Sequence, residues 1–438
     1  MKKAVGIVCE YNPFHNGHLY QINKIRKKYK DAVIIACLSG VFTQRGEISV
    51  LNKWDKTRLA LENGVDIVVE LPYVYATQGS DIFARYSVAI LNKLFTDVLC
   101  FGSESEDIKN IKKAAYNQVH DINFDIITKK YLDEGVNYPT ALNKALKELY
   151  NITISEPNDI LALSYLKEIY RNGYFMDTYN IKRTSSYHDL DSNAKVVSAS
   201  NIRTRLLNKK DIKDKVPSNV YELLKDKNMD SKYFEYLKYK ILSEEDLEKY
   251  VDVDEGLQQR IKKVINKSNS LDELIMNIKT KRYTYNKISR MLNHILCSFT
   301  KEDNKKVKYL EYIRILGFTE NGKNYLNSIK SEIDIPVLNK YNTRYDALRL
   351  EKRAVDIYSY IYEDISKEEV QNKPIYIKEN QEWYPDLFFY FNSFISVIDS
   401  PVNLEISSSF IFALSIFLAT EIIPSLLPSS FPASKPVW

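Results

Sequence analysis

Four short apolar runs separated by helix-like stretches fill the first hundred residues and constrain the fold most. The runs are AVGIVCEY (4–11), VIIACLSG (33–40), VDIVVELP (65–72) and DVLCFGS (97–103). Helical patterns near residues 17–30, 53–63 and 81–93 lie between them. Apolar, β-branched strands that alternate with helices are typical of a parallel sheet buried on both faces. We therefore predict an α/β fold with a doubly wound, Rossmann-like domain.

The rest of the chain is mostly helical in pattern. Residues 104–170 predict helices, and YFMDTYNIKR (174–183) predicts a strand that returns to the sheet. From Asp211 to about residue 365, Lys, Tyr, Leu and Glu recur at helical spacing, and PIYIKENQEWYPDLFFY (374–390) resembles a short β segment. We divide the chain into an α/β domain over 1–210, a mostly helical domain over 211–390 and an atypical tail over 391–438.

The composition is that of an ordinary soluble protein, with 27% charged and 45% hydrophobic residues and a net charge of +5. This mild positive charge allows a polyanionic partner but does not require one. Cys9, Cys37, Cys100 and Cys297 form no CxxC pair, so neither a zinc site nor a disulfide framework is predicted. Three of them lie inside apolar runs, where we expect buried free thiols, and a reducing cytoplasm fits best.

The tail differs from the rest of the chain. Tyrosine is absent after Tyr390, while FIFALSIFLATEIIPSLL is too short, and too interrupted by Glu421 and Pro424, for a membrane span. We expect no stable membrane partner, although an anchor is the alternative. Our hypothesis is an unrelated end, for example from a shifted reading frame. Detection of tail peptides by mass spectrometry of the native protein would refute it.

The motif HNGH follows the first predicted strand and carries two of the five histidines, His15 and His18. Ligands of open α/β sheets bind outside the carboxyl ends of the strands, where these side chains would lie. Gly17 lets the backbone come close, and the N-terminus of the following helix favours phosphate. Two imidazoles there can donate hydrogen bonds to phosphoryl oxygens, as nucleotidyl transfer requires. The alternative is that His15 caps the helix and His18 packs.

A second motif, VVSASNIRTRL (196–206), follows the returning strand. Ser198 or Ser200 can cap a helix whose first turn presents Arg203, and arginine binds phosphate with a rigid planar fork. A capped basic helix without a ligand is the alternative. The order of HNGH and SNIR along the chain makes the pair more specific than either motif alone.

These motifs resemble the nucleotidyltransferase superfamily with the HIGH-type Rossmann-like fold. Longer stretches resemble one family within it, the bacterial tRNA(Met) cytidine acetate ligases. They are GIVCEYNPFHNGH (6–18), LSGVFTQRGE (38–47), NKWDKTRLALENGVDIVVELP (52–72), FGSE (101–104), EPNDILALSYLKE (156–168), KRTSSYHD (182–189), SASNIR (198–203), KRYTYNKISRMLNHIL (281–296) and YIRILGFTENGK (312–323). The resemblance covers roughly residues 1–380.

The resemblance implies that the protein activates acetate with ATP to acetyl-adenylate and transfers the acetyl group to N4 of the wobble cytidine of elongator tRNA(Met). The 1–210 domain would then bind ATP and catalyse the reaction, and the 211–390 domain would bind tRNA. His15, His18, Ser200 and Arg203 would be catalytic. The ATP-binding residues would be Gly6, Ile7, Val8, Cys9, Glu10, Tyr11, Asn12, Pro13, Phe14, Asn16, Gly17, Gly102, Asn158 and Arg183.

Other polar residues near the strand ends have open roles. Mg²⁺ would neutralise the triphosphate, but no protein ligand is assigned, and Glu70 and Asp81 are candidates by position only. Gln44, Arg45 and Glu47 would line the acetate or cytidine pocket, or belong to an ordinary polar loop. Lys56 and Arg58 read as solvated helix surface.

The stretch KTKRYTYNKISR (279–290) interleaves cations with tyrosines, which suits single-stranded RNA. Lys281, Arg282, Tyr283, Lys287 and Arg290 are the predicted RNA-binding residues, and a solvated helix face is the alternative. The wobble base would have to flip out of the loop stack to reach the adenylate.

Two other functions stay open. A small-molecule adenylyltransferase of the pantetheine-phosphate or nicotinamide-mononucleotide kind would share the HxGH core but need little beyond it. A non-catalytic nucleotide- or tRNA-binding protein would tolerate loss of both histidines.

Overall fold

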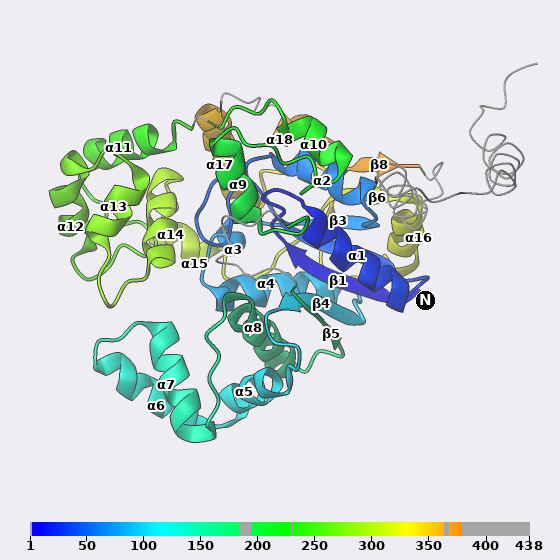
Figure 1. The fold of residues 1–438 in the computed structure, drawn as a ribbon, viewed down its shortest axis with the longest axis horizontal. Coiled ribbons are helices and arrows are strands. Elements are labelled where there is room, and N and C mark those ends of the chain that lie inside the picture. The colour runs from blue at the N-terminus through cyan, green and yellow to red at the C-terminus, as the bar shows by residue number, and fades with distance from the viewer. Residues whose placement is uncertain (1, 184–193, 230, 363–367, 379–438) are drawn as a thin grey trace, which may run out of the picture. The chain divides into compact units, whose positions relative to one another are not determined.

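The centre of the molecule is a sheet of five parallel strands in the order β5-β4-β1-β2-β3. The structure is a computed structural model that describes residues 2–183, 194–229, 231–362 and 368–378. The five strands are β1 (Ala4–Cys9), β2 (Val33–Ser39), β3 (Ile67–Leu71), β4 (Val98–Ser103) and β5 (Asp177–Lys182). Their shared direction brings all five carboxyl ends to one edge, and Figure 1 shows β1 and its neighbours side by side.

Three later strands extend this sheet beyond β3. They are β6 (Ile313–Thr319), β7 (Val337–Leu338) and β8 (Ile375–Ile377). β6 runs antiparallel to β3, and both β7 and β8 pair with β6. The prediction that residues 211–365 are mostly helical missed β6 and β7. The β segment expected at 374–390 includes β8. The remainder of that segment lies outside the described residues.

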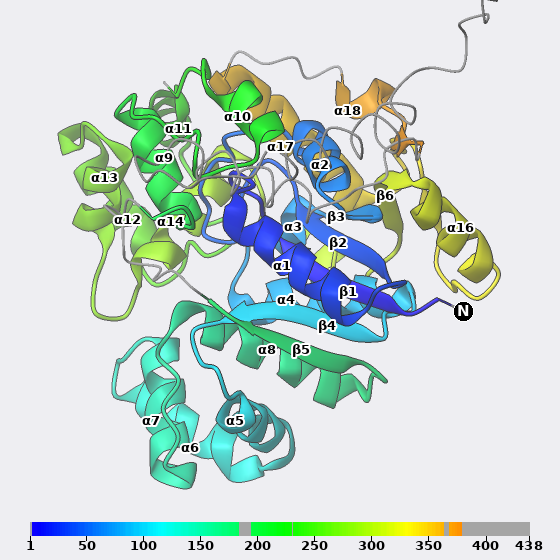
Figure 2. The ribbon, with the colours of Figure 1, turned by 45° about the vertical axis from the view of Figure 1, so that its right-hand side comes forward.

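Helices cover both faces of the sheet, so strands such as β2 and β3 are buried along their whole length. One face packs against α1 (Asn16–Lys28), α2 (Lys53–Glu62), α9 (Ala199–Leu207) and α10 (Ser218–Leu224). The other packs against α3 (Tyr73–Ala76), α4 (Ser80–Lys93) and α8 (Pro157–Asn172). Figure 2 shows α1 and α4 on opposite sides of β1.

The remaining helices form outer layers. α5 (Lys109–His120) packs on α8, and α6 (Ile122–Asp133) pairs with α7 (Tyr138–Tyr150). The segment after α10 contains α11 (Tyr233–Ser243), α12 (Leu257–Val264), the short 3₁₀ helix η1 (Ile265–Lys267), α13 (Leu271–Ile278), α14 (Tyr285–Leu296), α15 (Lys301–Lys306), α16 (Glu320–Ile329), α17 (Asp346–Tyr362) and α18 (Glu368–Gln371). The apolar residues of α11, α13 and α14 join the same core as the α4 and α8 face of the sheet.

The α/β prediction is confirmed, as are the expected strands and the helices of 104–170. Residues 1–381 form one compact unit, and the tail lies outside the described residues. The division near residue 210 therefore stays a prediction. In the described part of the chain, no helix is long and apolar enough to cross a membrane. All four cysteines are free and buried, and burial was predicted for three of them.

Candidate active site

The two histidines of HNGH lie at the carboxyl end of β1, where the chain turns into α1. The His15 ring stacks on that of His18, with centroids 3.7 Å apart. His15 is the N-cap of α1, and its Nδ1 accepts a hydrogen bond from Gly17 N at 3.0 Å. His15 N in turn donates to His18 Nδ1 at 3.2 Å. His15 therefore caps α1 and also lies at the strand end, as predicted.

These backbone bonds determine how the imidazoles face a ligand. Because both Nδ1 atoms accept from N–H groups, the proton of each neutral ring is on Nε2. Burial and, to a smaller extent, the charge of Arg183 lower the pKa of His15 to about 3. Burial, His15 and Arg183 also lower the pKa of His18 well below its usual value. At neutral pH the pair therefore presents two Nε2–H donors, which no described residue occupies.

The first N–H groups of α1 are already used. Asn16 N donates to Lys215 O at 3.1 Å, Gly17 N to His15 Nδ1, and His18 N to His15 O at 2.8 Å. The expectation that free N–H groups of this turn bind phosphate is wrong for these three. The donors at this turn are the imidazoles.

Two glycines lie beside the side chains of this site. A Cβ on Gly17 would lie 2.8 Å from His15 Cε1, so glycine is needed to keep that ring in place. A Cβ on Gly102, near the end of β4, would lie 3.4 Å from Arg183 Cγ. Arg183 N also donates to Ser103 O at 2.9 Å. Gly102, Arg183 and the histidines, far apart in sequence, thus lie at one edge of the sheet, as predicted.

The SNIR helix, α9, docks on the same edge. Ser198 is its N-cap and accepts from Asn201 N, while Ser200 lies in the first turn. Arg203 Nη1 donates to Asn12 O at 2.9 Å, and its Nη2 lies 2.6 Å from Glu47 Oε2. Arg203 therefore joins α9, the β1–α1 turn and the loop after β2, and its contact with a phosphate stays a prediction.

Asn158, at the start of α8, is held by a residue that the sequence reasoning did not single out. Glu104 accepts from Asn158 Nδ2 at 2.5 Å and from Asn158 N at 3.1 Å. Asp159 accepts in return from Glu104 N at 3.0 Å. These reciprocal bonds tie the loop after β4 to α8. The sequence feature that could have identified Glu104 is its position directly after FGS, at the end of a predicted strand.

The remaining residues of the predicted ATP-binding segment lie at different depths. Gly6 packs in the strand interior, where a Cβ would meet Leu91 and Thr96 at 2.9 Å. Ile7, Val8 and Cys9 also belong to β1 and the sheet core. Asn16 Nδ2 donates to Asp214 O at 2.9 Å and to Lys195 O. These residues support the turn that carries the histidines.

Tyr11, Asn12, Pro13 and Phe14 form that turn, and all four are buried. Tyr11 has φ of 45° and lies with its ring centroid 4.8 Å from that of His18. Asn12 Oδ1 accepts from Val50 N at 2.8 Å. The turn is therefore braced from both sides before it reaches His15.

The loop over residues 40–52 covers the next part of the edge. Gln44 N donates to Glu10 Oε1 at 2.6 Å, and Gln44 Nε2 to Gln78 O at 2.8 Å. Burial raises the pKa of Glu10 above its usual value, although the Gln44 bond and Arg45 oppose the shift. Glu10 and Gln44 thus lie together beside the β1 end, and the pocket role expected of Gln44, Arg45 and Glu47 stays a prediction.

Lys56 was expected on the solvated surface, and that expectation is wrong. The residue is 1% exposed, and its Nζ donates to the carbonyl oxygens of Glu10 at 2.9 Å, Ser39 at 2.8 Å and Gly40 at 2.5 Å. Burial lowers the pKa of Lys56 to about 8, with Glu10 opposing it. The Lys56 ammonium therefore binds carbonyl oxygens at the carboxyl ends of β1 and β2. Arg58 is half exposed, as expected.

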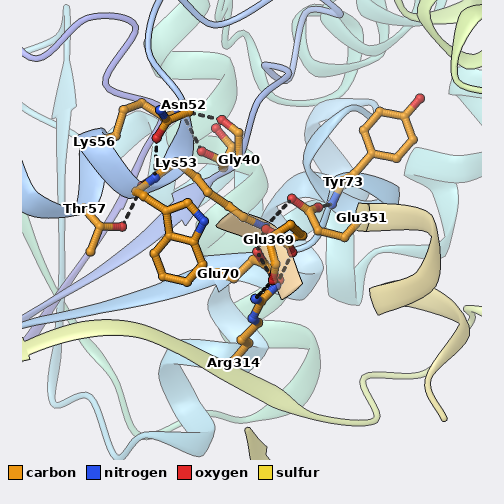
Figure 3. A network of polar contacts seen from close by, with 12 residues as sticks. Gly40, Asn52, Lys53, Lys56, Thr57, Glu70, Tyr73, Arg314, Glu351 and Glu369 are labelled. Atoms are coloured by element: carbon orange, nitrogen blue, oxygen red, sulfur yellow. Dashed lines mark hydrogen bonds and ion pairs between the residues drawn. The ribbon is translucent and has the colours of Figure 1, made fainter. Parts of the chain in front are cut away.

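A buried ionic network, drawn in Figure 3, lies beneath this edge. Lys53 and Arg314 converge on three carboxylates, those of Glu70, Glu351 and Glu369. Glu351 also accepts from Tyr73 N at 2.6 Å. It lies so close to Gly40 that a Cβ there would be 2.7 Å from its Oε1. α17 and α18 therefore brace the carboxyl ends of β2 and β3.

Each carboxylate considered for Mg²⁺ already pairs with a lysine ammonium. Glu70 is 1% exposed and lies 2.5 Å from Lys53 Nζ. Asp81 lies 2.9 Å from Lys167 Nζ and accepts from Ser164. Among the residues that the structure describes, no group of three or more His, Cys, Asp or Glu side chains could hold a metal ion.

The predicted RNA-binding residues lie on and before α14. Lys281 and Arg282 are exposed, and Arg282 Nη2 lies 2.9 Å from Glu255. Tyr283 is only 8% exposed and donates its hydroxyl to Glu255, so its ring is closed to a stacking base. Lys287 Nζ lies 5.1 Å from the Tyr283 ring centroid. Arg290 lies further along α14.

Comparison with known proteins agrees with this geometry. The chain matches the family model described as HIGH nucleotidyl transferase over residues 1–373, and it belongs to that class. A tRNA(Met) cytidine acetate ligase of Anoxybacillus flavithermus is 38% identical over 393 residues, which are 85% of this chain and 98% of that protein. The Bacillus subtilis protein of the same name is 37% identical over 87% of this chain and 99% of its own. The chain is therefore a member of the tRNA(Met) cytidine acetate ligase family.

Two solved structures extend the match to three dimensions. Apo Thermotoga maritima TmcAL has a TM-score of 0.79 at 28% identity and covers 86% of this chain and all of that one. The same protein bound with alpha-thio ATP has a TM-score of 0.76 at 27% identity, with the same coverage.

Proposed function

We propose that the protein is an ATP-dependent acetate ligase that makes N4-acetylcytidine at the wobble position of elongator tRNA(Met). One observation carries this proposal: the chain spans 98% of a tRNA(Met) cytidine acetate ligase at 38% identity. The paired Nε2–H donors at the strand end suit the adenylation step that such a ligase needs. The cytoplasm, where tRNA is modified, is the location that fits.

In the first step, an acetate oxygen attacks the α-phosphorus of ATP, and the bond from that phosphorus to the bridging oxygen of the β-phosphate breaks. Pyrophosphate leaves with the bonding electrons. His15 and His18 would donate their Nε2–H groups to phosphoryl oxygens as the charge on them grows. Arg203 and Arg183 would neutralise the triphosphate, and Gly102 would leave room for the nucleotide beside Asn158.

In the second step, N4 of the cytidine attacks the acetyl carbonyl, and the carbon–oxygen bond to AMP breaks. N4 loses one proton to solvent water, and AMP leaves with the electron pair of the broken bond. No enzyme nucleophile is required, which agrees with the burial of all four cysteines. Mg²⁺ would enter as part of a MgATP substrate.

The test uses purified protein with MgATP, labelled acetate and total bacterial tRNA. Label in N4-acetylcytidine is the expected result. Pyrophosphate release without labelled tRNA would contradict the acceptor and favour a small-molecule adenylyltransferase. Absence of any ATP chemistry, together with tRNA binding, would favour a non-catalytic binding protein.

The histidine role has its own variant. His18→Ala removes one Nε2–H donor and should abolish acetyl-adenylate formation while tRNA binding stays nearly intact. Acetate-dependent ATP–pyrophosphate exchange and a tRNA binding curve measure the two effects separately. Undiminished exchange in this variant would contradict the assignment.

A further inference from the structure

The loop over residues 40–52 is pressed against the backbone of α14. Gly46 has φ of 80°, and a Cβ there would lie 2.8 Å from Arg290 Cα and 2.8 Å from Ser289 C. Its N–H donates to Thr43 O at 3.0 Å. Glycine is thus required for both conformation and space. The loop that begins at the β2 end is thereby joined closely to α14 at Arg290.

Arg290 is an unusual residue in this seam. It is half-buried, its Nε is buried without a hydrogen-bond partner, and its guanidinium makes no hydrogen bond or close ion pair with any described residue. Burial lowers the pKa of Arg290 below its usual value; Asp252 opposes this shift and the charge of Arg45 adds to it. A desolvated cation without a hydrogen-bonded anion is unfavourable, so an anionic ligand would complete this site.

The groups facing Arg290 narrow the choice of anion. Asp252 Oδ2 lies 3.3 Å from His294 Nδ1, so that carboxylate is shared with another side chain. The other charged neighbours are cationic: Arg45 from the loop, whose charge acts on Arg290, and Lys287 one helical turn earlier, which acts on the same Asp252 as Arg290. Successive cations along one helix face suit the repeated charges of a phosphodiester backbone, and an arginine fork matches phosphate geometry. Acetate carries a single small carboxylate, so it needs fewer cations than a phosphodiester backbone does.

The seam also has the right position for RNA. The loop 40–52 carries Gln44 at the candidate pocket on one side and contacts α14 on the other. A base that is flipped into a site must have its flanking phosphates held just outside it. A site one loop away from the strand end meets that requirement.

We propose that Arg290, together with Arg45 and Lys287, binds a backbone phosphate of the tRNA beside the cytidine that enters the active site. This inference rests on the proposed function. It assigns the phosphate contact to the seam between loop 40–52 and α14, rather than to the exposed basic residues that precede α14.

The experiment compares wild type, Arg290→Ala and Arg58→Ala as matched control, since Arg58 is half exposed on the outer face of α2. Binding of unmodified tRNA(Met) is measured without ATP or acetate over a series of KCl concentrations. Arg290→Ala should bind about 10-fold more weakly, and the slope of log affinity against log salt should fall in magnitude by roughly 0.7 to 0.9, the value for one phosphate contact. Acetate-dependent ATP–pyrophosphate exchange should stay within about twofold of wild type.

Three results would overturn the inference. A raised KM for acetate with unchanged tRNA binding would make the seam a carboxylate site. Unchanged binding and unchanged exchange would show that Arg290 has no ligand. Equal losses of tRNA binding in Arg290→Ala and Arg58→Ala would show that only the net charge of the protein matters, and not a phosphate contact at Arg290. Arg290→Lys, which keeps the charge and loses the fork, provides a second variant if Arg290→Ala fails to fold, and it should still weaken tRNA binding.

Failure of this inference can be told from failure of the proposed function. Wild-type protein that acetylates tRNA, with binding indifferent to Arg290, would refute only the phosphate site. Wild-type protein that binds tRNA through Arg290 without acetylating it would refute only the ligase.

Discussion

Replacing Gly17 by alanine should lower the rate of the adenylation step and leave the folding stability nearly unchanged. The new Cβ would lie 2.8 Å from His15 Cε1 and 2.9 Å from its Nδ1. An ordinary carbon–carbon contact needs about 3.5 Å, so the His15 ring would have to move by roughly 0.7 Å. That movement also strains the bond from residue 17 N to Nδ1, which holds the proton of this imidazole on Nε2.

The expected magnitudes follow from these distances. A displacement of about 1 Å at a reacting centre costs roughly 100-fold in rate, so acetate-dependent ATP–pyrophosphate exchange should fall by about 10- to 100-fold. Folding should hardly change. Alanine gains about 1 kcal/mol over glycine as a helix former, while weakening the capping bond loses about 1 kcal/mol.

The assay is exchange kinetics together with urea unfolding. Gly79→Ala is the matched control, because nothing lies within 4 Å of a Cβ there, and its exchange rate should equal that of wild type. Full activity in Gly17→Ala would refute the role of His15 geometry. A loss of activity that only follows a large loss of stability would refute the separation of the two.

The buried lysines and carboxylates give two further predictions. Burial raises the pKa of Glu351 to about 7, despite Lys53, from an ordinary value of 4.5. The folded state then holds a proton that the unfolded state releases, so the unfolding free energy should fall as pH rises from about 4.5 to 7. Glu351→Gln should flatten this dependence in urea titrations between these pH values, and an unchanged slope would contradict it. Lys56→Met leaves three buried carbonyl oxygens without their donor and should lower the unfolding free energy by about 3 kcal/mol. Arg58→Met should change it by less than about 0.5 kcal/mol, and equal effects would contradict the role of burial.

The sequence predicted the parallel sheet and the strand-end site because both depend on local patterns. Apolar runs such as VIIACLSG can be buried only between layers, and the carboxyl ends of parallel strands necessarily share one edge. His15, Gly102 and Arg183 each follow or end such a run. Their proximity therefore follows from chain direction alone.

The parts that were missed depend on distant partners. Lys56 reads as surface because lysine is almost always solvated, and only the folded strand ends show three carbonyl oxygens around it. The strand β6 pairs with β3 from about 250 residues further along the chain, which no local pattern specifies. Tyr283 was expected to stack on a base, but Glu255, in a separate turn, binds its hydroxyl.

Helix capping and phosphate chemistry were opposed interpretations of HNGH, but the geometry makes them complementary. A neutral imidazole has one donor and one acceptor nitrogen, and which is which depends on its partners. Capping uses Nδ1 of His15 as acceptor, and His15 N fixes His18 in the same way. Each cap therefore leaves Nε2–H as a donor of defined direction, while burial keeps both rings neutral. A histidine that did not cap could rotate or change tautomer, and would be the poorer ligand for a phosphate.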